Sequence, residues 1–325
     1  MKRFNGIALS VAFCSLASQA ALAQTKIDTL KVQNLNEVIV KGVRATKEAP
    51  YAVANIRKSE LKQFSCSGQE LPFLLSRTPG ILAWSENGIG TGTTYMRIRG
   101  AAGSRINVTL DGVALNSPED QTVFWANMNS YSSLLGSIQV QRGVGSSTNG
   151  DGAFGGSISM ATAAPSLTPT AEVTGSFGSY NTYHTGASFS TGLLGKHLIF
   201  DGAYHETATD GYVDGTAGRS GSYYGGLTWL GDNFKISYKN IGNFEKTGQA
   251  WNGVLGGDYN SNFTLLEDGI RTYKDMYKAG LDKFNVLTGD LVRNGKGDYS
   301  ITPYTLRDGN KWDKTTDNFY QNHNI

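Results

Sequence analysis

The chain has 325 residues, of which only 17% are charged, and its formal net charge is +2. This balance excludes the strongly basic surface of a nucleic-acid-binding protein, and it also excludes an acidic tail. Its 41 glycines point to many turns, and after the first 23 residues no apolar run approaches the roughly 20 residues of a membrane helix.

The N-terminus has the pattern of a secretory signal peptide. Lys2 and Arg3 precede an apolar run over residues 7–17, which is too short to span a bilayer. The small residues Ala21 and Ala23 then provide a cleavage site. We therefore predict a signal peptide over residues 1–23, which implies an exported protein.

The two cysteines add little chemistry. Cys14 would carry lipid in a lipoprotein signal, but Phe13 stands where a small residue is needed, which disfavours that alternative. The mature chain keeps only Cys66, so an internal disulfide is excluded, and we predict Cys66 as a small packing residue.

Residues 24–44 are predicted to form a leader. Its first part is polar and has no periodicity, and an extended-favouring run follows, with β-branched side chains at Val38, Ile39 and Val40. A short strand on a tether is suited to pair with the exposed edge of another protein's sheet. The alternative is an ordinary first strand of the domain that follows.

Glycine-punctuated strands dominate the next part of the chain. They read Pro79-Gly80, Ile98-Arg99-Gly100, Leu110-Asp111-Gly112, Gln139-Val140-Gln141-Arg142-Gly143 and Gly152-Ala153-Phe154-Gly155-Gly156-Ser157-Ile158. Each glycine follows a short β-like run, where a residue free to adopt positive φ allows a sharp turn. Arg99 and Arg142 end apolar strands, so we predict that both are buried and need carboxylate partners.

Other elements of this region are a helix and a small mixed sheet. Ser67 and Glu70 have the spacing of a capping box, and Leu71, Leu74 and Leu75 form one apolar face of a helix that ends before Pro79. Strands are predicted at 94–99, 106–110, 137–141 and 157–161, with a helical or irregular excursion over 124–135.

After Pro165 and Pro169 the pattern changes to the period-2 alternation of strands that face lipid on one side and water on the other. We predict five strands, at 171–177, 183–190, 197–205, 222–229 and 234–241, and a sixth over 317–325. The outward set includes Val173, Phe177, Phe189, Phe200, Leu227, Trp229, Phe234, Ile236, Tyr238 and Ile241. Residues 193–196 and 230–233 are predicted as tight turns, and 207–221 as a long loop. The stretch 245–316 is predicted as one large loop, with two further irregular strands as the alternative.

The ordered glycine motifs between residues 74 and 162 resemble the plug domain of TonB-dependent outer-membrane receptors. The resemblance implies a small α+β plug domain over 45–165, followed by an antiparallel transmembrane β-barrel. Residues 166–325 would supply five or six of its about 22 strands, too few to enclose the plug, so we expect the sequence to be a fragment of a longer protein. Residues 24–44 would be a periplasmic leader, and its TonB box would comprise Leu35, Glu37, Val38, Ile39 and Val40.

The same resemblance implies roles for particular residues. Arg99 and Arg142 would pair with carboxylates of the inner barrel wall beyond this sequence; the alternative is pairing within the plug, with Asp111. Substrate would meet loops 85–93, 101–105 and 116–121 on the extracellular side. The candidate contacts are Asn87, Ser104, Arg105, Asn116, Glu119, Asp120, Gln121 and Trp125.

The implied function is active transport of a scarce nutrient across the outer membrane. TonB and outer-membrane lipid would be the partners, and a ferric siderophore would be the first choice of cargo, with cobalamin second. No catalytic residue, cofactor, metal site or nucleic-acid partner is expected, because the sequence has neither a phosphate-binding loop nor a serine elbow. A cell-surface binding or adhesion protein is the alternative of another class.

Overall fold

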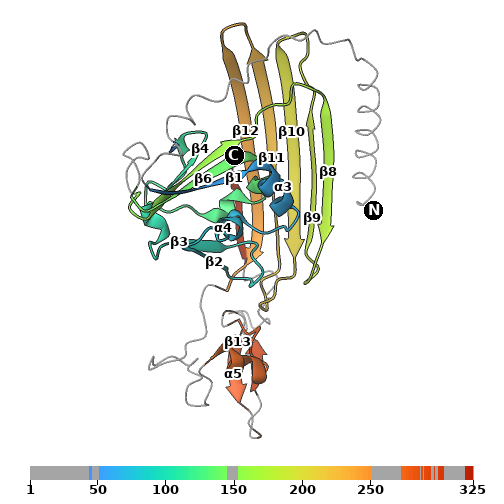
Figure 1. Ribbon diagram of the computed structural model, residues 1–325. Helices are drawn as coiled ribbons and strands as arrows, with labels where there is room; N and C mark the ends of the chain where they lie inside the picture. The colour runs from blue at the N-terminus through green and yellow to red at the C-terminus, as the bar shows by residue number, and fades with distance from the viewer. Residues whose placement is uncertain are drawn as a thin grey trace, which may run out of the picture.

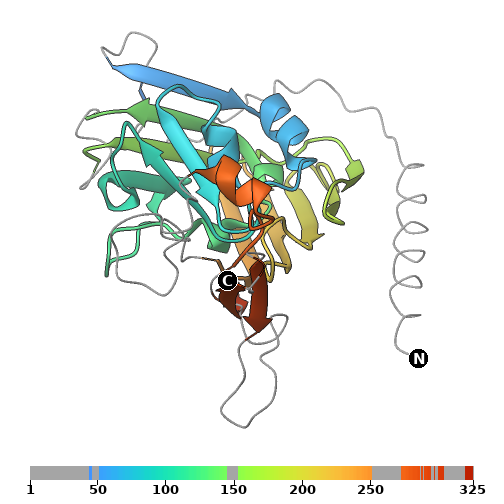
Figure 2. The same cartoon turned by 90° about the horizontal axis from the view of Figure 1, so that it is seen from below.

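The computed structural model describes residues 44–45, 51–144, 153–250, 272–285, 287, 289–293, 296, 299–303 and 319–324. The predicted signal peptide, the TonB box and nearly all of the leader lie outside these residues, as does most of 245–316. Two units are seen: an N-terminal domain up to residue 162, and a tall six-stranded sheet. Figures 1 and 2, at right angles to each other, both show the domain against one face of this sheet.

The N-terminal domain is built on a mixed five-stranded sheet in the order β1-β6-β7-β4-β5, in which only the β4–β7 pair is parallel. Strands β2 and β3 form a separate hairpin. The strands are β1 (Ala52–Arg57), β2 (Ile81–Ser85), β3 (Thr94–Ile98), β4 (Ile106–Leu110), β5 (Val113–Ala114), β6 (Leu135–Arg142) and β7 (Gly156–Thr162). The four predicted strands correspond to β3, β4, β6 and β7, whereas β1, β2 and β5 were not foreseen.

The domain has two helices: α3 (Lys58–Ser65) packs against β1 and β6 of this sheet, and α4 (Leu71–Leu75) packs against the β2–β3 hairpin. The predicted apolar face of Leu71, Leu74 and Leu75 is buried in the core. The predicted helix start is wrong. The N-cap of α4 is Glu70, because Gly68 at φ +70° turns the chain and separates Ser67 from the helix.

The remaining elements of the N-terminal domain are short. The segment 124–135 contains the 3-10 turns η2 (Trp125–Met128) and η3 (Tyr131–Ser133), as predicted, and η1 (Gly103–Arg105) precedes β4. Cys66 is exposed rather than packed. No helix among the described residues is long and apolar enough to cross a membrane.

The six-stranded sheet is entirely antiparallel, in the order β15-β12-β11-β10-β9-β8. Its strands are β8 (Thr170–Phe177), β9 (Tyr183–Ser190), β10 (Leu198–Thr209), β11 (Gly218–Leu230), β12 (Lys235–Gly248) and β15 (Phe319–Asn324). All six predicted strands are therefore found. Strands β10 and β11 are longer than predicted, which shortens the loop expected over 207–221 to residues 210–217.

The stretch predicted as one large loop contains regular structure. Its described part holds α5 (Tyr273–Lys278) and a hairpin of β13 (Gly289–Arg293) and β14 (Tyr299–Pro303), which forms its own two-stranded sheet. The alternative of two further strands thus describes this part better, although they do not pair with the six-stranded sheet. Figure 1 shows α5 and the hairpin beyond one end of that sheet.

Candidate functional site

The two faces of the six-stranded sheet have opposite character. The face against the N-terminal domain carries the buried polar side chains His184, His205, Thr207, Ser220, Ser222, Asn243, Glu245 and Thr247. The other face exposes Val173, Phe177, Phe189, Phe200, Leu227, Trp229, Phe234, Ile236 and Tyr238. A sheet that is polar on its covered face and apolar on its exposed face reverses the arrangement of a soluble protein. It is the alternation expected of strands that face lipid outward.

Ile241 is an exception to the predicted facing. It was placed on the outer face, but it packs against the hydrophobic core of the N-terminal domain, together with Tyr224 and Ala203. Alternation along β12 puts Ile241 on the same side as Lys239 and Asn243. The covered face therefore combines a small apolar contact with a mainly polar surface.

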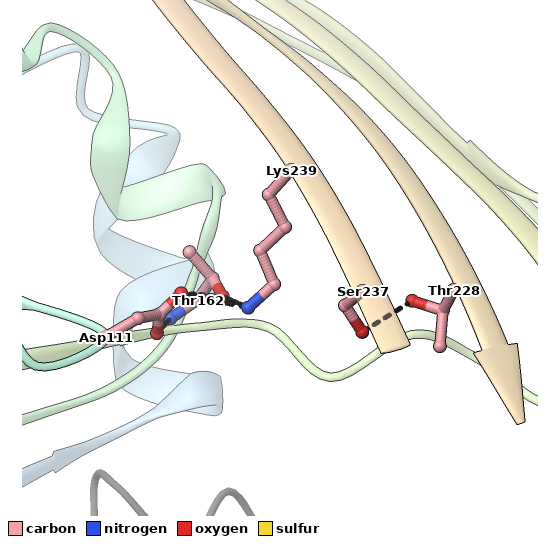
Figure 3. A network of polar contacts seen from close by, with 5 residues as sticks. All are labelled: Asp111, Thr162, Thr228, Ser237 and Lys239. Atoms are coloured by element: carbon pink, nitrogen blue, oxygen red, sulfur yellow. Dashed lines mark hydrogen bonds and ion pairs between the residues drawn. The ribbon is translucent and has the colours of Figure 1, made fainter. Parts of the chain in front are cut away.

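A polar network joins the N-terminal domain to β12 (Figure 3). Lys239 Nζ lies 2.9 Å from Asp111 Oδ2 and donates to Thr162 Oγ1 at 2.6 Å. Thr162 in turn donates to the two Asp111 carboxylate oxygens, from its backbone N at 2.9 Å and its hydroxyl at 2.7 Å. One lysine of the sheet thus binds the ends of both β4 and β7.

The backbone holds Asp111 in place for this contact. Asp111 follows β4, adopts φ +50° and donates its backbone N–H to the carbonyl of Met160 at 2.9 Å. Burial raises the pKa of the Asp111 carboxyl, but the hydrogen bonds from Lys239 and Thr162 together outweigh it, and the pKa is lowered. Asp111 is therefore ionised at neutral pH, and the pair with Lys239 is charged.

Further contacts tie the N-terminal domain to the sheet and its loops. Lys62 of α3 lies 2.7 Å from Glu172 of β8, an exposed pair of a kind that contributes little. At the end of the sheet near α5, Ala250 N donates to Glu86 Oε2 at 2.9 Å, and Tyr212 N donates to the Asn87 carbonyl at 2.9 Å. The domain is therefore held by several polar contacts rather than by one apolar interface.

The structure does not bear out the predicted burial of Arg99, which is exposed at φ +50° in the turn after β3. Arg142 is half-buried and donates from Nη1 to the Pro79 carbonyl at 2.7 Å. Within the described part of the chain neither arginine forms an ion pair with a carboxylate. The alternative pairing with Asp111 is wrong, because Lys239 occupies that carboxylate. Pairing with wall carboxylates beyond this sequence stays a prediction.

Two of the predicted substrate contacts are buried. Asn87 is only 2% exposed, and its side chain binds within its own loop, to Thr91 Oγ1 and to the backbone N of Ile89. Trp125 is 5% exposed and belongs to the hydrophobic core. Neither can touch a ligand in this arrangement, so both assignments are corrected to structural roles.

Asn116 is also structural. Its Oδ1 accepts from Val108 N at 2.8 Å and its Nδ2 donates to the Ile106 carbonyl at 2.8 Å. The side-chain amide of Asn116 thus makes the two hydrogen bonds to β4 that the backbone of a neighbouring strand would make. Ser104 is half-buried, and the side chains at the surface are Arg105, Glu119, Asp120 and Gln121. Loops 101–105 and 116–121 lie together, because Gly103 is next to Thr122. Loop 85–93 instead meets Tyr212.

Sequence reasoning missed a cavity at the end of the sheet where loop 85–93 meets Tyr212. Its volume is about 270 Å³, and it is lined by residues of the β10–β11 loop and by Lys283. Lys283 Nζ lies 5.4 Å from the centre of the Tyr212 ring and 5.8 Å from that of Tyr180. The Tyr212 hydroxyl also binds Asp282 and Tyr273. The lining combines the Lys283 ammonium and the Tyr212 ring with the carboxylates of Asp210 and Asp214, so it offers aromatic, cationic and anionic contacts to a ligand.

A search of the described residues for three or more His, Cys, Asp or Glu side chains placed to hold a metal finds none. The four predicted surface contacts and the cavity near Tyr212 offer binding surfaces. The polar contact between the N-terminal domain and the sheet is the most extensive functional feature of the described chain.

Residues 45–157 match the family model of the TonB-dependent Receptor Plug Domain. This part of the chain is thus a plug domain of TonB-dependent receptors, and the resemblance drawn from its glycine motifs is confirmed. No curated protein matches the chain.

Solved structures agree on the fold. The pyoverdine outer membrane receptor FpvA from Pseudomonas aeruginosa PAO1, bound to pyoverdine, has 17% identity and a TM-score of 0.52, with 66% of this chain and 32% of that chain covered. The copper transporter OprC has 15% identity and a TM-score of 0.51, with 63% and 32% covered. The chain therefore spans about a third of the length of these structures. Its fold is a plug domain followed by part of an antiparallel β-barrel.

Proposed function

We propose that the protein works in TonB-dependent active transport across the outer membrane. The observation that carries this proposal is a plug domain held by polar contacts against the inward face of strands whose other face is apolar. A polar contact can be exchanged for water at low cost, whereas an apolar one resists separation. The plug is thus attached firmly enough to block a path and loosely enough to be displaced.

The sheet order of the plug suggests how a pull would act. Strand β1 follows the leader, and among the strands that the structure describes it is an edge strand, paired only with β6. Just before it, Arg44 donates to the Ser137 hydroxyl at 2.9 Å and to the Ser159 carbonyl at 2.9 Å. We propose that TonB binds residues 35–40 by strand addition, and that force first breaks the Arg44 contacts and then detaches β1. Separating an edge strand leaves the central β6–β7–β4 pairing intact.

Cargo would bind at the end of the barrel where loop 85–93 meets the cavity beside Tyr212 and Lys283. The first choice is a ferric siderophore, a class that includes the pyoverdine bound by the similar FpvA structure. The Lys283 ammonium beside the Tyr212 ring can contact a flat, anionic metal chelate, although the carboxylates of Asp210 and Asp214 also line the cavity. Cobalamin is the second choice. In this scheme the protein binds and moves its cargo and makes or breaks no covalent bond.

A cell-surface binding or adhesion protein remains the alternative of another class. It would bind a partner at the outer loops but would need neither a displaceable plug nor energy from the inner membrane. The two classes therefore differ in whether bound cargo enters the cell.

The test supplies cells that express the complete gene with radiolabelled ferric siderophores of several chemical types, and separately with labelled cobalamin. Transport predicts accumulation of at least one cargo inside the cell, and a loss of accumulation when a protonophore collapses the proton gradient. A Lys283→Ala variant should weaken cargo binding, and Lys278→Ala, an exposed lysine of α5, serves as its control. Surface binding without entry would favour the adhesion alternative and refute the proposal.

A further inference from the structure

Two buried carboxylates lie near each other at the contact between the plug and the sheet. Glu70, at the N-cap of α4, is 3% exposed, and Glu245, on the covered face of β12, is 1% exposed. Burial and the nearby charge of Glu245 raise the pKa of Glu70 well above its usual range. Among the described residues, Glu70 Oε2 and both Glu245 oxygens have no hydrogen bond of acceptable geometry. Such groups are costly to bury without compensation.

Two buried asparagines point to the same place. Asn243 precedes Glu245 by two residues, so it lies on the same face of β12; it is 2% exposed, and neither of its amide atoms has a partner within the described chain. Asn129 is completely buried after η2, and its side chain lies within hydrogen-bonding reach of Glu245. Its Nδ2 donates to the Ala126 carbonyl, which leaves Oδ1 unpartnered by any described residue. These amide oxygens are independent of the carboxylates and are also unused.

Hydroxyl groups complete the set of donors. Thr93 and Thr94 are buried, and their Oγ1 atoms likewise have no partner in the described ranges. Their segment reaches β12, because the neighbouring Gly92 packs against Thr247, two residues after Glu245. All these potential ligands are oxygen atoms, and three of them belong to the two carboxylates.

This donor set selects the class of ligand. Hard divalent cations bind oxygen atoms, and Ca²⁺ accepts about 6–8 of them in flexible geometry, whereas transition metals favour nitrogen and sulfur. Two carboxylates would balance the charge of one divalent cation. Protons or water molecules could also satisfy these oxygen atoms. A proton or a water molecule binds few acceptors, however, whereas a divalent cation needs many, contributed here by both the plug and the sheet.

We propose that the two carboxylates and the two amide oxygens bind a Ca²⁺ ion between the plug and β12. The ion ties α4 to the sheet, and this attachment is separate from the Asp111–Lys239 pair. It would resist displacement of the plug and would be lost when the plug moves away from β12. The proposal does not depend on transport or on the identity of the cargo.

The test measures calcium binding to the complete protein in detergent, by titration calorimetry with calcium chloride alone and by thermal unfolding with calcium or with a chelator. The variants are Glu70→Gln, Glu245→Gln and the neutral Asn243→Ala. The matched control is Glu172→Gln, which removes a carboxylate from the same face of the sheet but at an exposed ion pair.

We expect the wild type and Glu172→Gln to bind calcium and to unfold at a higher temperature in its presence. Both effects should be absent in Glu70→Gln and Glu245→Gln, and Asn243→Ala should bind about tenfold more weakly. If the glutamine variants do not fold, wild-type titration and Asn243→Ala still decide the question. No calcium binding by the wild type, or equal binding by the wild type and Asn243→Ala, would overturn the proposal. Stabilisation by glutamine without any calcium effect would identify protonated carboxyls instead.

Discussion

Substitution of Lys239 by alanine should loosen the plug without unfolding the sheet. Lys239 is the only residue of β12 that binds Asp111, among the residues that the structure describes, and it also donates to Thr162. Its loss leaves the Asp111 carboxylate partly buried, with the Thr162 hydrogen bonds and the nearby charge of Arg44 to compensate its charge.

The size of the effect follows from the burial of the pair. The Lys239 and Asp111 side chains are 19% and 21% exposed, so the pair lies between a fully exposed and a fully buried ion pair. Exposed pairs contribute about 0–1 kcal/mol, and removing one partner of a fully buried pair costs about 3–5 kcal/mol. We therefore expect a loss of about 2 kcal/mol, which corresponds to roughly a 30-fold change in the equilibrium between attached and detached plug.

Amide hydrogen exchange measures this equilibrium directly in the detergent-solubilised protein. The backbone amides of Asp111 and Thr162, which lie at the Lys239 contact, should exchange roughly 30-fold faster in Lys239→Ala, because detachment of the plug exposes this contact to water. The control is Lys246→Ala, an exposed lysine of the same strand, which should leave these amides unchanged. Equal exchange in Lys239→Ala and the wild type would show that the ion pair does not hold the plug, and would refute the reasoning.

Three further predictions follow from single residues. The pKa of Asp111 is lowered in the folded protein, so the ionised carboxylate stabilises the fold fully above the unfolded pKa, near 3.8, and this stabilisation is lost as the pH falls further. The free energy of unfolding by denaturant should therefore change less on acidification in Asp111→Asn than in the wild type. Gly92→Ala should cost about 1–3 kcal/mol in the same assay, because a Cβ there would collide with Thr247, whereas Gly100→Ala, also at positive φ but in open space, should cost less. Arg142→Ala should speed proteolysis near Pro79, and unchanged cleavage would contradict a holding role.

The strands of the six-stranded sheet could be predicted because each obeys a local rule. A strand with one apolar and one polar face alternates with period 2, and this alternation is visible within the sequence of each strand. Ile241 was misplaced because it was assigned to the outer face by its apolar character, whereas alternation puts it on the covered face, where the plug supplies an apolar partner. Nothing in the neighbouring residues reports a partner that is distant in the sequence.

The interface contacts were not predictable for the same reason. Asp111 and Lys239 are separated by 128 positions, so no spacing links them. Strand β1 has weak alternation and depends on pairing with β6, about eighty residues away. Trp125 follows a polar loop in sequence, which suggested a binding site, but the 3-10 turn η2 directs it into the core. Burial of that kind is decided by tertiary packing.

The central claim is that energy from the inner membrane reaches the plug through the leader and opens a path for cargo. Its most direct test deletes residues 35–40 from the complete gene and compares cargo binding with cargo accumulation in living cells. The account predicts that the deletion variant binds cargo as the wild type does but accumulates none. Accumulation at the wild-type rate after this deletion would contradict it.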